Sequence, residues 1–69
     1  MPNDQDKARE KIQENASEIG DKELSAAARM ACNPSFKRIV ENHLTSKMDV
    51  VDAPDVANIA CDVYQKNLE

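Results

Sequence analysis

The dipeptide Asn33-Pro34 places the firmest constraint on how this chain folds, because it both ends one helix and begins another. A proline disfavours the α conformation at the residue before it, so a helix that precedes Pro34 must end by Asn33. The same proline suits the first turn of a new helix, where its missing amide hydrogen costs nothing, and Asn33 is a good N-cap. The sequence therefore predicts a helix boundary at this dipeptide.

The apolar residues on either side of this boundary repeat with helical spacing. After it, one face of a helix expected over residues 34–46 carries Phe36, Ile39, Val40, His43 and Leu44. The same spacing predicts a helix over residues 53–67, whose apolar face carries Val56, Ile59, Ala60, Val63 and Tyr64. Before the boundary, a helix expected over residues 21–32 has a face of mostly small residues, which are Leu24, Ala27, Ala28 and Ala31.

These three segments define the expected fold class. A single glycine, Gly20, and scattered Ala, Glu and Lys residues favour helices over a turn-rich β-fold. We expect a small all-α domain with three helices over residues 21–69. The helices at 34–46 and 53–67 should form a hairpin, with the alanine face of the helix at 21–32 packed across it.

Residues 1–20 are expected to form an N-terminal arm, either as a weakly amphipathic helix or as a disordered segment. The apolar residues of this arm form one narrow helical stripe, which consists of Ala8, Ile12, Ala16 and Ile19. Short helices are marginal in water unless an apolar face is buried against another surface. We therefore interpret the stripe as a candidate contact for a protein partner or for a second copy of the chain.

The charge pattern restricts the kinds of partner. Thirteen acidic and nine basic residues give a net charge of −4, which disfavours non-specific nucleic-acid binding. Residues 21–48 nevertheless hold five basic and three acidic residues. Within them, Lys37 and Arg38 lie off the apolar face and are candidate partner-binding residues. They also leave open a helix-turn-helix-like regulator that binds DNA as a dimer.

No residue pattern in the sequence indicates catalysis, a cofactor or a metal. Nucleotide-binding loops need several glycines, whereas this chain has one. Cys32, His43 and Cys61 are spaced too widely to resemble a zinc site, in which ligands usually occur in close pairs. We therefore expect no enzyme activity, no cofactor, no metal and no small-molecule substrate.

The sequence also predicts a location. No apolar run approaches the roughly 20 residues that span a bilayer, and the first residues lack the apolar core of a signal peptide. We expect a soluble cytoplasmic protein without membrane contact. Cys32 and Cys61 should then be reduced and act as small core residues, with a disulfide or a reactive thiol as the alternative.

A chain of 69 residues can bury only a small core, so contact with another surface can add much to its stability. We interpret the sequence as a small, acidic, non-enzymatic protein that binds and modulates a protein partner, as a regulator or an inhibitor does. The alternatives are the DNA-binding regulator and a structural component of a larger assembly.

Overall fold

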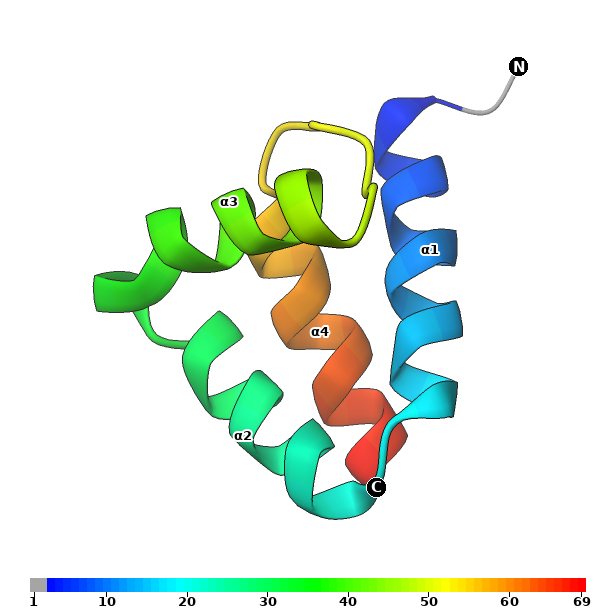
Figure 1. Cartoon of the computed structure of the whole chain (residues 1–69), viewed down its shortest axis with the longest axis vertical. Coiled ribbons are helices and arrows are strands. Elements are labelled where there is room, and N and C mark those ends of the chain that lie inside the picture. Colours follow the sequence, from blue (N-terminus) through cyan, green and yellow to red (C-terminus); the bar gives the residue numbers. More distant parts are fainter. Residues whose placement is uncertain (1–2) are drawn as a thin grey trace.

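The computed structural model describes residues 3–69, which form four α-helices and one short 3-10 helix (Figure 1). The elements are α1 (Asp4–Glu18), α2 (Asp21–Ala31), η1 (Pro34–Phe36), α3 (Lys37–Lys47) and α4 (Val56–Leu68). The all-α prediction is confirmed, and the three helices expected over residues 21–69 are present with small shifts at their ends. α1 is the additional helix, and it lies where the sequence predicted either a weak helix or disorder.

The boundary at Asn33-Pro34 has the predicted chemistry. α2 ends at Ala31, and the Asn33 side chain accepts a hydrogen bond from the Ser35 amide at 2.9 Å. Pro34 begins the 3-10 turn η1, so regular α-helix starts only at Lys37. The dipeptide therefore stops one helix and caps the entry into the next.

α4 is the central helix of the fold, with α1 and α2 on either side of it (Figure 1). One broad face of α4 is buried, and it consists of Val56, Ala57, Ile59, Ala60, Val63 and Tyr64. This face is wide enough to contact more than one neighbouring helix. Its most extensive contacts are with α2 and α1, whereas α3 contacts it over a shorter stretch. The expected hairpin of the last two helices is therefore corrected to an arrangement in which α1, α2 and α3 all contact α4.

α1 belongs to the same core as the other helices. Ala8, Ile12 and Ala16 are buried, and the two alanines leave room for α4 to approach closely. The Asn3 side chain caps α1 by accepting a hydrogen bond from the Asp6 amide at 2.8 Å. Three of the four residues in the predicted stripe of the arm are thus buried against the chain's own last helix, and Ile19 is the exception.

Polar contacts along the outer edge fix α1 against α4. Arg9 donates a hydrogen bond to Asp62 at 2.8 Å, which is also an ion pair between the two helices. This hydrogen bond lowers the pKa of the Asp62 carboxyl from its ordinary value, against a smaller opposing effect of desolvation. Further along, Gln13 and Asn67 exchange two side-chain hydrogen bonds of 3.1 and 3.0 Å. These contacts fix the register of α1 along α4.

Cys32 and Cys61 form a disulfide that joins the end of α2 to the middle of α4. Their Cα atoms lie 4.8 Å apart, which is within the range that a disulfide can bridge. The expectation of two reduced thiols is therefore wrong. The two cysteines are 29 positions apart in the sequence and meet only because α2 packs along α4.

Candidate functional site

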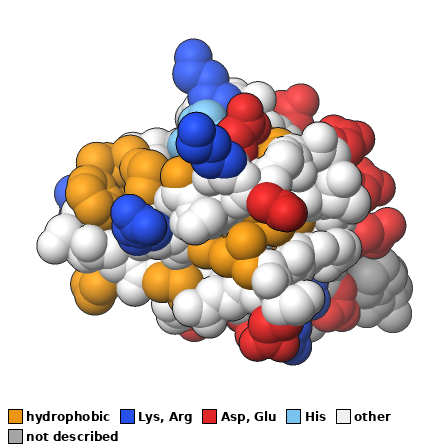
Figure 2. Space-filling model, turned by 90° about the horizontal axis from the view of Figure 1, so that it is seen from below, with side chains coloured by type: hydrophobic (Ala, Val, Ile, Leu, Met, Phe, Trp, Pro, Cys, Tyr) orange, Lys and Arg blue, Asp and Glu red, His pale blue; other side chains and the backbone are white. Residues whose placement is uncertain are grey.

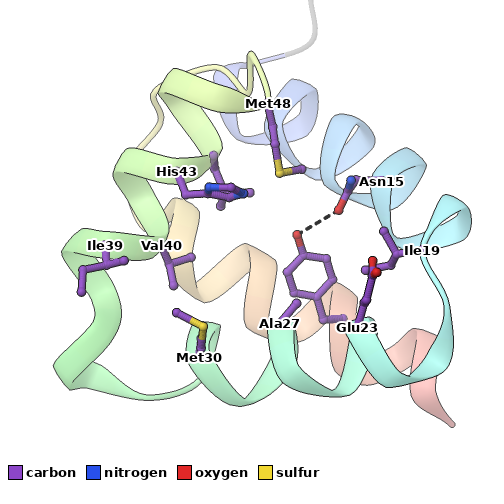
Figure 3. A pocket seen from close by; sticks show the side chains of 11 residues that line it. Asn15, Ile19, Glu23, Ala27, Met30, Ile39, Val40, His43 and Met48 are labelled. Carbon is purple, nitrogen blue, oxygen red and sulfur yellow. Dashed lines mark hydrogen bonds between the residues drawn. The ribbon is translucent and has the colours of Figure 1, made fainter.

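A groove opens between α2 and α3, above α4 (Figure 3). Its volume is about 340 Å³, which is within the size range of ligand-binding pockets. α4 contributes only the nearly buried Tyr64, which therefore lies at its base. The walls consist of Asn15 and Ile19 from α1, Glu23, Ala27 and Met30 from α2, Ile39, Val40, His43 and Leu44 from α3, and Met48.

Large apolar side chains are exposed at one end of this groove. Ile39 is 55% exposed and Met30 is 40% exposed, and both line the groove; Phe36, just before α3, is 37% exposed. The sequence placed Phe36 and Ile39 in the core, but only Val40 and Leu44 of that face are buried. The reason is that α3 meets α4 along one edge, so half of its apolar face has no neighbour. Met30 and Ile39 thus expose apolar surface together at this end of the groove, and exposed apolar patches are typical of interaction sites.

The two ends of the groove differ in polarity. Figure 3 shows Met30, Ile39 and Val40 together at one end, and Asn15 and Glu23 beside Ile19 at the other. His43 and Met48 lie along the edge between these ends. The two ends of the groove are therefore chemically different, one apolar and the other polar.

Tyr64 links the base of the groove to α1. Its hydroxyl donates a hydrogen bond to the Asn15 side-chain oxygen at 3.3 Å. Burial raises the pKa of the Tyr64 phenol above its ordinary value of 10.0, because the phenolate would lose its solvation. The neutral hydroxyl is thus the form that the folded protein holds at the groove.

The raised pKa of Tyr64 predicts a loss of stability in alkali. In the unfolded chain this tyrosine ionises near pH 10, whereas in the folded protein it stays neutral to higher pH. Stability should be unaffected by this group below about pH 10 and should fall as the pH rises above it. Tyr64 is the only tyrosine of the chain, so ultraviolet absorbance reports its titration alone. A midpoint at or below 10 in the folded protein would contradict this expectation.

A second, more polar hollow of about 220 Å³ adjoins the groove at Asn15 and Met48, which line both. Its other lining residues are Lys11, Glu14 and Glu18 of α1. Together with Glu23, these two glutamates place three carboxylates at the α1 end of the groove, against the single ammonium group of Lys11. We refer to Glu14, Glu18 and Glu23 as the acidic end.

Lys37 and Arg38 are exposed in the first turn of α3, but they do not line the groove, because their positions on the helix turn them away from Ile39. In Figure 2, hydrophobic side chains gather mainly at the left and Asp or Glu side chains predominate along the right, while Lys or Arg side chains lie at the upper left and again at the lower right. The left side corresponds to the corner between α2 and α3 in Figure 1, and the right side corresponds to α1.

The structure separates the residues that the sequence grouped as candidate partner contacts. Ala8, Ile12 and Ala16 are buried against α4, so they are not accessible to a partner in this fold. Ile19, half-buried, lines the groove. Partner binding by Ile19, Lys37 and Arg38 stays a prediction. Sequence reasoning missed the groove itself. One indication of it was present in the sequence, because Met30 does not lie on the apolar face that buries Leu24 and Ala28.

His43 is an exposed groove residue, whereas the sequence placed it on the buried face of its helix. Within residues 3–69, His, Cys, Asp and Glu side chains form no group of three that is placed to hold a metal ion. The groove offers apolar contact at one end, hydrogen bonding at Asn15 and Tyr64, and the carboxylates of the acidic end at the other.

Comparisons with known proteins assign the chain to no group, because no family model, curated protein or solved structure matches it. Across residues 3–69, none of the helices has the length and apolar character needed to cross a membrane. The function must therefore be argued from the groove and its charges.

Proposed function

We propose that this chain is a small, acidic, non-enzymatic protein that binds and modulates a protein partner through the groove between α2 and α3. The observation that supports the proposal is the exposure of Ile39 and Met30 in a groove of about 340 Å³. Interface centres are enriched in Met and aromatic residues, and surrounding charges set the orientation of the partner. Lys37 and Arg38, exposed in the first turn of α3, are candidate charges of this kind.

The proposal predicts that Ile39→Glu weakens partner binding strongly while the fold remains intact. Ile39 is more than half exposed, so the change removes little from the core, yet it places a charge in the apolar end of the groove. A partner recovered by cross-linking and mass spectrometry with the wild-type chain should be recovered at least about tenfold less with the variant. Circular dichroism should show unchanged helix content.

Asn42→Glu is the matched control for this experiment. Asn42 is exposed on α3 but does not line the groove, so the variant adds the same charge to the same helix elsewhere. It should recover the partner as well as the wild-type chain does. Equal recovery by the Ile39→Glu variant, or equal loss with Asn42→Glu, would count against the groove as the binding surface.

DNA binding is the second candidate, and the exposure of Lys37 and Arg38 on α3, directly after a helix and a turn, favours it. The net charge of −4 opposes it, because duplex affinity depends on the number of phosphates that basic residues neutralise. A salt-dependent mobility shift on DNA that Lys37→Ala and Arg38→Ala abolish would support this candidate instead.

The predicted cytoplasmic location stays a prediction, and the disulfide bears against it. Disulfides persist in oxidising compartments and are rare among cytosolic proteins, where they are mostly transient or redox-sensing. Alkylation of the protein inside its cells, followed by mass measurement, distinguishes two free thiols from the Cys32–Cys61 bond.

A further inference from the structure

The groove runs along a second stripe of α2, which is distinct from the stripe that this helix buries in the core. Glu23, Ala27 and Met30 form this second stripe, and all three line the groove. Residues at these spacings lie above one another on one face of a helix. Since an α-helix rises about 1.5 Å per residue, the seven positions from Glu23 to Met30 cover about 10 Å. An acidic residue and an exposed methionine are thus two helical turns apart along one wall.

Methionine is prominent at the apolar side of the groove. The two methionines within residues 3–69, Met30 and Met48, both line it. The unbranched thioether side chain adapts to neighbours of different shape, and surfaces rich in Met are typical of proteins that bind helical segments. Ile39 lies beside Met30 in Figure 3 and is more than half exposed. This end of the groove therefore suits the large apolar side chains of a partner.

The acidic end gives the groove an excess of negative charge. Glu14, Glu18 and Glu23 are exposed, and Lys11 is the one basic residue that lines either hollow. Asp62 is the acidic member of both ion pairs found within residues 3–69, so the three glutamates of the acidic end have no internal ion pair. Positive charges on a partner would be attracted to this end and would fix the partner's orientation.

The architecture favours a helix as the occupant. Residues 3–69 contain no β-strand, so an extended segment would find no sheet edge to which its backbone could hydrogen-bond. A helix satisfies its own backbone and presents side chains at the i, i+4 and i+7 positions to a neighbouring surface. That spacing is the same as the spacing of Glu23, Ala27 and Met30 along the wall of the groove.

We propose that the groove binds a basic amphipathic helix of a protein partner. The apolar residues of this helix lie against Met30 and Ile39, and its Lys or Arg residues lie two turns away, against the acidic end. The inference rests on the proposed function, in which a protein occupies the groove, and it names the class of partner. Because the bound helix and α2 have the same rise per residue, its basic residues should be about seven positions from its apolar ones.

Two synthetic helical peptides of identical composition provide the test. Both carry two leucines four positions apart. In the facing peptide, a lysine follows each leucine by seven positions and shares its helix face, whereas in the opposed peptide it follows by nine positions and lies on the other side. We expect the wild-type chain to bind the facing peptide at least about fivefold more tightly. Isothermal titration calorimetry at low salt measures both dissociation constants, and circular dichroism checks that the peptides are equally helical.

Two charge variants of the chain show whether the acidic end is responsible. The first carries Glu14→Lys, Glu18→Lys and Glu23→Lys, and it should lose the preference for the facing peptide. The second has the same net charge, but its changes are at exposed positions that line neither hollow, so it should keep the preference. Its substitutions are Glu10→Lys, Asp52→Lys and Glu69→Lys. Circular dichroism of each variant establishes that its helices are intact.

The Ile39→Glu variant separates this inference from the proposed function. It should bind both peptides at least about tenfold more weakly than the wild-type chain does. If the two peptides bind the wild-type chain equally and both need Ile39, the groove remains the binding surface and the basic helix is the wrong partner. Failure of the proposed function would instead appear as undiminished recovery of the cellular partner by the Ile39→Glu variant.

Three further results would overturn the basic helix as the occupant. The first is that neither peptide binds the wild-type chain at millimolar concentration. The second is that the variant altered at the acidic end keeps the full preference for the facing peptide. The third is a wild-type chain that sediments as a dimer and becomes a monomer with Ile39→Glu, because a second copy would then cover the groove.

Discussion

Reduction of the Cys32–Cys61 disulfide should lower the free energy of unfolding by about 3.6 kcal/mol, because the unfolded chain regains the freedom of a closed loop. The sequence separation of 29 residues sets that value. A domain of this size has a total stability of only about 3.5–10 kcal/mol. The reduced protein should therefore be close to its folding limit, with a melting temperature lower by about 15–30 °C.

Thermal unfolding followed by circular dichroism, with and without a thiol reductant, measures this effect. The double variant Cys32→Ser with Cys61→Ser is the control, since it should melt at the lower temperature and should not respond to the reductant. Alkylation must show that both thiols of the wild-type chain are free after treatment. An unchanged melting temperature in that fully reduced sample would refute the stabilising role of the disulfide.

Ile12→Ala should cost about 2–5 kcal/mol of stability, because it removes a fully buried side chain between α1 and α4. Ile12 is one of the largest side chains with no solvent exposure, and its neighbours in the stripe, Ala8 and Ala16, cannot fill the space left behind. Urea denaturation gives the change in free energy directly. This result would show that α1 is part of the core and not an arm that is ordered only by a partner.

Ile19→Ala is the matched control in the same helix region. Ile19 is only half-buried at the wall of the groove, so the same change in side chain should cost distinctly less. If both variants lose equal stability, or if Ile12→Ala costs less than about 1 kcal/mol, α1 does not pack on α4 as described.

The faces of the helices could be predicted from the sequence where a neighbour covers them. The spacing of Val56, Ile59 and Val63 identified the buried face of α4, and Leu24 and Ala28 identified that of α2; these predictions are confirmed. The same reasoning was wrong for Phe36 and Ile39 of the third segment. Periodicity tells which residues share a face, but it does not tell whether another element lies against that face.

The groove could not be predicted for a related reason. Its lining comes from all four α-helices and from Met48, so it exists only once their relative positions are fixed. The position of α1 was equally hidden, because a stripe of two alanines and two isoleucines is too thin to hold a helix alone. It becomes a packing surface only beside α4, whose buried face is wide enough to contact both α1 and α2.

The disulfide has a consequence for the shape of the groove as well as for stability. Cys32 lies just before the turn that leads into α3, so the bond anchors one end of that wall to α4. At its other end, α3 is continued by residues 48–55, where Val50 and Ala53 are buried and the Val50 amide donates to the Leu44 carbonyl at 2.9 Å. Between these two attachments, α3 makes the least extensive contact with α4 of the three surrounding helices. The width of the groove therefore depends on a helix that is attached at both ends and whose middle joins the core through only two buried residues, Val40 and Leu44.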